Sequence, residues 1–154
     1  MFQASHHIAC YFATGEEFDS YPLIEKIWQA KKNCYLPILA EKSLHFVLYQ
    51  ENDPLHCNQY KILEPNCIEI FATNQLDLVL VPLVGYDLQG GRLGMGGGYY
   101  DRTFSFLLTE PKKIIYLGLA YSCQEVSDLP HHFWDVMLDG VVTEKEIKIF
   151  NGNF

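Results

Sequence analysis

Hydrophobic residues along the chain fall into short runs that alternate with polar, turn-forming segments. Apolar runs of about four to eight residues with such boundaries predict buried strands. Residues 51–75, which contain Pro54 and Pro65, are expected to be mostly connection. Strands are expected within residues 7–13, 33–39, 44–50, 78–82, 112–121 and 135–147.

Two helices are expected between these strands. In the first, apolar residues recur at helical spacing from Leu23 to Trp28, and Pro22 suits the first turn. The second is expected at residues 99–110, where apolar residues again share one helical face. Strands that alternate with helices indicate an α/β fold. We therefore expect a single domain over residues 1–154, with a largely parallel sheet flanked by helices.

Composition narrows the functional classes. The 154 residues carry a formal net charge of −8 and show no extended basic patch, so we expect no nucleic-acid partner. No apolar run reaches the roughly 18 residues of a membrane-spanning helix, and the N-terminus does not resemble a signal peptide. Five cysteines without a C-x-x-C spacing predict reduced thiols. The expectation is a cytoplasmic monomer with no membrane partner.

The segment "RLGMGGGYYDR", residues 92–102, concentrates backbone freedom and charge, and seven of the eleven glycines lie between Gly85 and Gly98. It is expected to join a strand to a helix, and parallel sheets bind ligands beyond the carboxyl ends of their strands. Glycine backbones approach phosphates closely, and the planar fork of Arg92 can grip phosphate oxygens. Asp101 offers oxygens to Mg²⁺. The simpler interpretation is a glycine-rich turn with tyrosines in the core.

Neither common nucleotide signature is present in this segment. A Walker loop needs a lysine followed by serine or threonine, and no such pair occurs in this glycine-rich segment. A Rossmann fingerprint needs a third glycine where Tyr99 stands. A phosphate site here must therefore be of another type.

The long motif "DLVLVPLVGYDLQGGRLGMGGGYYDR" resembles the signature of the 5-formyltetrahydrofolate cyclo-ligase family, also called 5,10-methenyltetrahydrofolate synthetase. Further segments in the same order extend the resemblance over nearly the whole chain: "GEEFDSYPLIEKI", "YKILEP", "LGLAYSCQ" and "LPHHFWDVMLDGVVTE". The resemblance implies an α/β enzyme that binds ATP, Mg²⁺ and 5-formyltetrahydrofolate. In that reaction ATP phosphorylates the formyl oxygen and the N10 amine attacks the activated carbon. The products are 5,10-methenyltetrahydrofolate, ADP and phosphate.

The resemblance also implies roles for individual residues. Arg92 and Asp101 would be catalytic, Asp101 and Asp135 would serve Mg²⁺, and Asp139 is the alternative to Asp135. The ATP phosphates would lie against Arg92, Leu93, Gly94, Met95, Gly96, Gly97, Gly98, Tyr99 and Tyr100, and the folate against Phe12, Glu17 and Tyr99.

The resemblance also places Tyr121 and Gln124 near the nucleotide. Other residues nearby have simpler interpretations, and Asp87 is expected to form a turn. His131 and His132 follow Pro130 in a loop and are expected to be exposed.

Two alternatives to the enzyme remain open: a weak or inactive relative that binds folate or nucleotide, and a sugar-phosphate isomerase. The family usually begins with a basic helix over the ATP, whereas this sequence has no Lys or Arg before Lys26. We therefore expect either that this form binds ATP weakly or that it is an incomplete version of a longer chain, unless His6, His7 or the pair Lys112–Lys113 supplies the positive charge.

Overall fold

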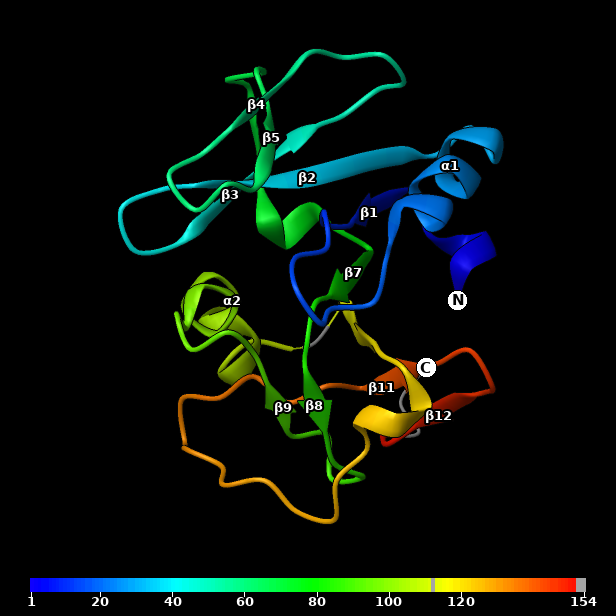
Figure 1. The fold of residues 1–154 in the computed structure, drawn as a ribbon, viewed down its shortest axis with the longest axis vertical. Helices are drawn as coiled ribbons and strands as arrows, with labels where there is room; N and C mark the ends of the chain where they lie inside the picture. Colours follow the sequence, from blue (N-terminus) through cyan, green and yellow to red (C-terminus); the bar gives the residue numbers. More distant parts are fainter. Residues whose placement is uncertain (112, 152–154) are drawn as a thin grey trace.

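The central feature of the molecule is a sheet of eight strands in the order β12-β11-β10-β7-β1-β2-β3-β6 (Figure 1). It is seen in a computed structural model that describes residues 1–111 and 113–151. The sheet strands are β1 (His7–Ala9), β2 (Asn33–Leu39), β3 (Leu44–Leu48), β6 (Ile70–Phe71), β7 (Leu78–Val81), β10 (Ile115–Leu119), β11 (Gly140–Val142) and β12 (Ile147–Ile149).

The middle of the sheet is parallel and both margins are antiparallel. β1 pairs in parallel with β2 and β7, and β10 pairs in parallel with β7 and β11. β3 and β6 extend one margin in antiparallel fashion, and β12 extends the other. The prediction of an α/β domain with a largely parallel sheet is confirmed. The carboxyl ends of β1, β7 and β10 consequently meet at one edge.

Two layers of apolar side chains cover the two faces of this sheet. Successive residues of β2 alternate between them, so Cys34 and Leu36 join one layer and Tyr35 the other. Helix α1 (Tyr21–Gln29) buries Ile24 and Ile27 in the first layer. Burial of one such side chain contributes roughly 1.5–3 kcal/mol, which explains why a nine-residue helix is stable here.

Helix α2 (Tyr99–Thr103) is shorter than predicted. It covers five residues and is followed by a separate 3-10 turn, η3 (Ser105–Leu108), instead of running to residue 110. Phe104 joins the two and is fully buried in the second layer. Packing of this ring decides the path of the chain, so helical spacing alone overestimated the helix. The flanks of the sheet are covered largely by loops.

Residues 51–75 contain more structure than predicted. They form a two-stranded hairpin, β4 (Leu55–Cys57) with β5 (Leu63–Pro65), then the edge strand β6 and the 3-10 turn η2 (Thr73–Gln75). Each of these elements has only two or three residues. Such strands are too short to show a repeating pattern and depend on tertiary contacts. The remaining 3-10 turns are η1 (Phe2–Ala4) and η4 (Ser122–Gln124).

A second hairpin separates β7 from α2. Strands β8 (Gly85–Tyr86) and β9 (Arg92–Leu93) pair with each other outside the main sheet. The predicted single loop between strand and helix therefore contains this hairpin and only then the glycines at residues 94–98. Gly90, at φ +92°, closes the turn, and Leu138 N donates a hydrogen bond to its carbonyl.

Gly90→Ala should lower the free energy of unfolding by about 2–4 kcal/mol. A side chain at a left-handed φ costs about 1–2 kcal/mol, and the added Cβ would lie 2.7 Å from Leu138 O. Gly15→Ala is the matched control, because Gly15 also has a positive φ (+57°) but open space around it. Urea unfolding should show a loss of about 1 kcal/mol for the control. Equal losses in both variants would refute the predicted clash.

Two sequence expectations concern the chain as a whole. All five cysteines are free thiols, as predicted, and burial raises the pKa of Cys10 to about 11. Within residues 1–111 and 113–151, no helix has both the length and the apolar character needed to cross a bilayer.

Candidate functional site

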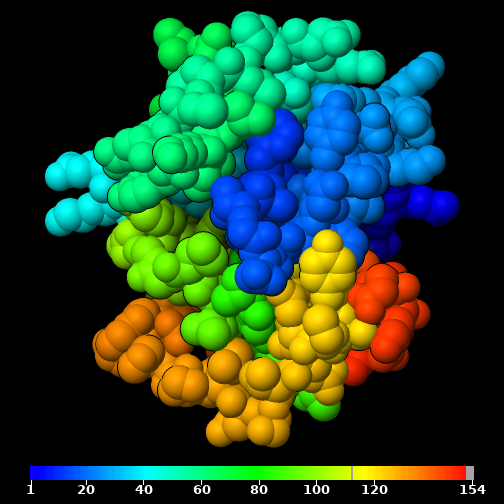
Figure 2. All heavy atoms as spheres, in the orientation of Figure 1, coloured from blue at the N-terminus to red at the C-terminus, as the bar shows by residue number. Residues whose placement is uncertain are grey.

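The candidate site lies at the edge where the parallel strands end. The segments that leave β1, β7 and β10 come together there. They are residues 10–19, 82–98 and 120–124, respectively. Figure 2 shows the segment 12–19 (blue) between the β4–β5 hairpin (green-cyan) and the chain that follows β10 (yellow). Ligands of parallel sheets bind at this edge.

Asp87 connects the β8–β9 hairpin to the loop at residues 129–136. Its side chain is fully buried and accepts hydrogen bonds from the backbone N–H groups of Gln89 (3.0 Å), Gly91 (2.8 Å) and Leu129 (2.9 Å). His131 Nε2 lies 2.9 Å from Asp87 Oδ2. Burial opposes ionisation of Asp87, but these hydrogen bonds outweigh it and lower its pKa. The expected turn residue is therefore also a cross-link.

The two histidines of that loop differ. His131 and His132 are both exposed, as predicted, but the imidazole of His131 is anchored on Asp87. The ring of His132 stacks on Trp134, with the centroids 4.5 Å apart.

The glycine loop at residues 94–98 presents its backbone to solvent. Gly96 (φ +91°) and Gly98 (φ +68°) adopt left-handed conformations that glycine permits. In the described part of the chain, the N–H groups of residues 94–98 donate no hydrogen bond to the protein. They are therefore available to an anion.

Arg102 supports this loop from behind. Its Nη2 donates to Gly97 O at 2.8 Å and its Nε donates to Lys42 O. Its guanidinium also lies over the ring of Tyr99, 5.0 Å from the centroid. The sequence alone does not indicate this role of Arg102, because it depends on a contact with residue 42, which is distant in sequence.

Arg92 and Asp101 face each other beside the glycine loop. Arg92 Nη2 lies 3.4 Å from Asp101 Oδ1, and only 9% of the Arg92 side chain is exposed. The guanidinium also donates a long hydrogen bond of 3.4 Å to Pro82 O. These contacts are loose for a nearly buried guanidinium.

Three buried polar atoms at this pair and beside it have no hydrogen-bond partner in the described residues: Arg92 Nε, Tyr100 OH and Tyr116 OH. Burial raises the pKa of Tyr100 and Tyr116, and the positive charge of Arg92 opposes the rise at Tyr116. Buried polar atoms usually have partners. Their convergence on Arg92 fits a site that a polar ligand or water completes.

Two carboxylates near the loop, those of Asp101 and Asp135, offer oxygen ligands for Mg²⁺. Asp101 Oδ1 accepts from Val136 N at 3.0 Å, which places the neighbouring Asp135 close to the same site. Asp135 Oδ2 accepts from His132 N, so each carboxylate keeps one oxygen without a described protein donor. Asp139 Oδ2 instead accepts from Tyr116 N and orders the start of β10. Of the two alternatives, Asp135 fits better.

Across the described residues, no group of three or more His, Cys, Asp or Glu side chains is arranged to hold a metal ion. Mg²⁺ does not require such a group, since it commonly binds through one or two carboxylates together with substrate phosphates and water. Asp101 and Asp135 therefore fit Mg²⁺ that arrives with a nucleotide.

Phe12 and Glu17 line one pocket of about 480 Å³. Glu17 Oε1 accepts hydrogen bonds from Thr14 N (2.8 Å) and Thr14 Oγ1 (2.6 Å), which hold the loop and leave Oε2 without a described donor. Tyr121 forms part of the same wall. The other lining residues are Ala13, Thr14, Gly15 and Asp19 from the loop and Lys61, Ile62 and Leu63 from the β4–β5 hairpin.

Tyr99 connects this hairpin to the glycine loop. A hydrogen bond with Tyr60 raises the pKa of the Tyr99 phenol. Tyr100, the next residue, is near enough to Glu17 for that carboxylate to add to the rise in its pKa that burial causes. The Arg92 guanidinium lies 5.7 Å from the centroid of the Tyr100 ring, so Tyr100 links the Arg92 cluster to the Glu17 pocket. Tyr60 was not among the predicted site residues.

Tyr121 and Gln124, which the resemblance places near the nucleotide, lie beside the segment that contains Glu17. Tyr121 lines the Glu17 pocket, and Gln124 Nε2 donates to Glu16 O at 2.9 Å. The turn η4 directs both residues toward the loop that follows β1. Strand order, which the sequence does not reveal, decides this placement.

The residues that were considered as a source of positive charge for the ATP lie at the opposite edge of the sheet. His6 and His7 precede or open β1, and their N–H groups bind the Asp77 carboxylate. Lys113 is near them, because Ile115 N donates to Asp77 O, whereas Lys112 lies outside the described residues. These are amino ends of parallel strands, so the three described residues are not placed to reach the glycine loop.

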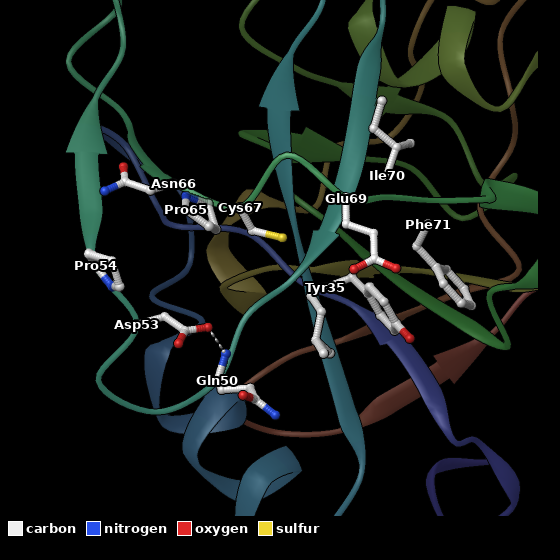
Figure 3. A pocket seen from close by; sticks show the side chains of 11 residues that line it. Tyr35, Gln50, Asp53, Pro54, Pro65, Asn66, Cys67, Glu69, Ile70 and Phe71 are labelled. Atoms are coloured by element: carbon white, nitrogen blue, oxygen red, sulfur yellow. Dashed lines mark hydrogen bonds between the residues drawn. The ribbon is translucent and has the colours of Figure 1, made fainter.

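A larger pocket, of about 530 Å³, lies apart from the predicted residues. Figure 3 shows Tyr35 and Phe71 on one side of it and Asp53, hydrogen-bonded to Gln50 N, on the other. None of the predicted site residues contributes to its wall. Its residues come from β2, β3 and the segments around β5 and β6, away from the carboxyl ends of β1, β7 and β10. The smaller pocket is the better candidate.

Comparison with known proteins gives a consistent result. A model of the 5-formyltetrahydrofolate cyclo-ligase family matches residues 1–144. The 5-formyltetrahydrofolate cyclo-ligase of Haemophilus influenzae is 42% identical over 137 residues, covering 86% of this chain and 72% of the relative. That of Escherichia coli K12 is 38% identical over 151 residues, covering 93% and 80%.

A solved structure shares the fold. The NMR structure of 5,10-methenyltetrahydrofolate synthetase from Aquifex aeolicus superposes with a TM-score of 0.81 at 30% identity. The match covers 99% of this chain and 76% of the other.

Proposed function

The chain belongs to the 5-formyltetrahydrofolate cyclo-ligase family, and we propose that it catalyses the ATP-dependent cyclisation of 5-formyltetrahydrofolate to 5,10-methenyltetrahydrofolate, releasing ADP and phosphate. The observation that carries this proposal is the adjacency of two subsites. One is the Arg92 cluster with its exposed glycine backbone, and the other is the Glu17 pocket. A reaction between two bound substrates requires this arrangement.

At the first subsite, the protein would hold the ATP phosphates. The free N–H groups of residues 94–98 point to an anion, and Arg92 would shift from its long contacts onto phosphate oxygens. Asp101 and Asp135 would hold Mg²⁺, which neutralises charge on the phosphates when it is bound. Tyr99 and Tyr100 would form the wall between the nucleotide and the folate.

At the second subsite, Phe12, Glu17 and Tyr99 would bind the folate. The pocket brings an aromatic ring and a carboxylate together, which suits a flat heterocycle with N–H groups. The formyl oxygen would face the γ-phosphate, attack it and displace ADP. The N10 amine would then attack the formyl carbon, lose its proton and displace phosphate.

Both nucleophiles in this reaction belong to the substrate. The protein therefore needs no Ser, Cys or His nucleophile; it positions two anionic ligands and stabilises the charge of the transferred phosphoryl group. A monomer that acts in the cytoplasm stays a prediction.

The appearance of 5,10-methenyltetrahydrofolate, followed by absorbance, tests the proposal. Product should form only when ATP and Mg²⁺ are both present, and chelation of the metal should stop it. Folded protein that binds folate but forms no product at any ATP concentration would identify the weak or inactive relative. Turnover of a phosphosugar without ATP would instead support the isomerase.

Glu17→Gln should raise KM for 5-formyltetrahydrofolate about five- to tenfold and leave KM for ATP nearly unchanged. The amide oxygen still accepts from Thr14, so the loop is kept, but the charge-assisted hydrogen bond to the folate is lost. Steady-state kinetics with each substrate varied in turn gives both constants.

Glu16→Gln is the matched control, because the adjacent Glu16 side chain is outside the pocket wall. It should leave both constants unchanged. If Glu17→Gln alters only the ATP kinetics, Glu17 belongs to the other ligand.

A further inference from the structure

Lys61 adopts an unusual backbone conformation at the tip of the β4–β5 hairpin. Its φ is +60°, in the left-handed region that side chains with a Cβ rarely occupy. Asn58 stabilises this conformation with both its backbone carbonyl oxygen and its side-chain oxygen. Asn58 O accepts from Lys61 N at 2.9 Å, and Asn58 Oδ1 accepts from the N–H groups of Tyr60 (2.8 Å) and Ile62 (3.1 Å).

The hairpin tip is also tied to the rest of the molecule. Asn58 Nδ2 donates to Glu64 Oε2 at 3.0 Å, and the same oxygen accepts from Leu39 N at the end of β2 at 2.7 Å. Glu64 is buried, so this anchor is shielded from water. Lys61 is therefore held at a defined place by a rigid turn, and strained residues held in this way cluster at ligand-binding sites.

Lys61 is a positively charged residue in the wall of a pocket whose other charged residues are acidic. Lys61 is the single Lys or Arg among the residues lining that pocket, and Glu17 and Asp19 are its acidic members. Within residues 1–111 and 113–151, the Lys61 ammonium makes no hydrogen bond or ion pair. The side chain is exposed, so it stands at the mouth of the pocket while Glu17 lies half-buried behind it.

We propose that Lys61 is a specificity-determining residue that binds a carboxylate of the glutamyl tail of the folate. This inference rests on the proposed function. The tail carries carboxylates that are ionised at neutral pH, and it must leave the pocket once the ring system is bound beside Glu17. An unpaired ammonium at the mouth, in a chain of net charge −8, selects for such a tail.

Calorimetric titration with two ligands tests this role: 5-formyltetrahydrofolate and 5-formyltetrahydropteroate, which lacks the glutamate. Lys61→Gln should weaken binding of the first about three- to tenfold and leave binding of the second unchanged. Lys61→Arg should restore affinity. Added salt should weaken binding of the first ligand to the parent protein more than to Lys61→Gln.

Lys61→Gly separates the effect of the Lys61 charge on affinity from the effect of its backbone strain on stability. It should lose affinity as Lys61→Gln does, but it should raise Tm by about 1–3 °C, because glycine tolerates the left-handed φ. Lys31 is a matched control: it is exposed, has a φ of +55° at the end of α1 and is outside the pocket. Lys31→Gly should raise Tm similarly without any change in affinity.

Equal affinities of Lys61→Gln and the parent for 5-formyltetrahydrofolate would overturn the proposal, as would an equal loss for the ligand without the tail. Failure of the proposed function is a different result. In that case the parent protein binds neither ligand, or binds both and forms no methenyl product with ATP.

Discussion

Arg92→Ala is expected to lower kcat/KM for ATP at least about tenfold. Each charge-assisted hydrogen bond is worth roughly 1.5–3 kcal/mol, and about 1.4 kcal/mol corresponds to a factor of ten in rate. Arg92 opens β9, and its guanidinium lies beside Gly94 of the glycine loop, with a buried Nε that has no described partner. Initial rates at varied ATP and saturating folate measure the loss.

The fold should tolerate this substitution. Both polar contacts of Arg92 are 3.4 Å long, so little stability depends on them, and Tm should fall by only about 1–3 °C. Arg92→Lys keeps the charge without the planar fork and should recover part of the activity. An unchanged dependence on ATP in Arg92→Ala would show that this arginine does not contact the phosphates.

Asp87→Ala is expected to destabilise the protein by about 3–5 kcal/mol and to abolish most activity. The substitution removes a fully buried carboxylate that accepts from three backbone N–H groups and contacts His131, and removal of one member of a buried, hydrogen-bonded pair typically has this effect. The β8–β9 hairpin carries Arg92, so the loop that contains Asp135 would no longer be held against it. Urea unfolding measures the change.

Asp53→Ala is the control for the loss of stability expected in Asp87→Ala. Asp53 also accepts a backbone hydrogen bond in a turn, from Gln50 N at 2.8 Å, but it has one such donor and lies far from the glycine loop. A loss of about 1 kcal/mol is expected. If the two aspartates have equal effects, Asp87 is a simple turn residue.

The same carboxylate predicts a pH dependence. The pKa of Asp87 is lower in the folded protein than its ordinary value, so its ionised form stabilises the fold. That contribution is fully present above about pH 4, near the pKa of an unfolded aspartate, and is lost as pH falls through the lower folded pKa. Asp87→Asn should be less stable than the parent at neutral pH, and the difference should narrow below pH 4.

Local sequence determined much of this protein. The strand at residues 33–39 was predicted to the residue, because its apolar run is long and clearly bounded. The glycine loop and its candidate anion chemistry were also visible, since left-handed turns and exposed backbone require glycine in the sequence itself. The order of motifs indicated the family without any spatial information.

Tertiary structure decided the features that depend on distant partners. Strands of two or three residues, such as β4 and β6, exist because other strands pair with them, and the long helix predicted at residues 99–110 gave way to the packing of Phe104. The contacts of Asp87 with residues 129 and 131 join segments about forty positions apart. Nothing in the sequence distinguishes Lys61 from other lysines, whereas in the structure Asn58 holds it in a left-handed turn. Sequence patterns report the preferences of neighbouring residues, whereas these features arise from contacts that only the folded chain creates.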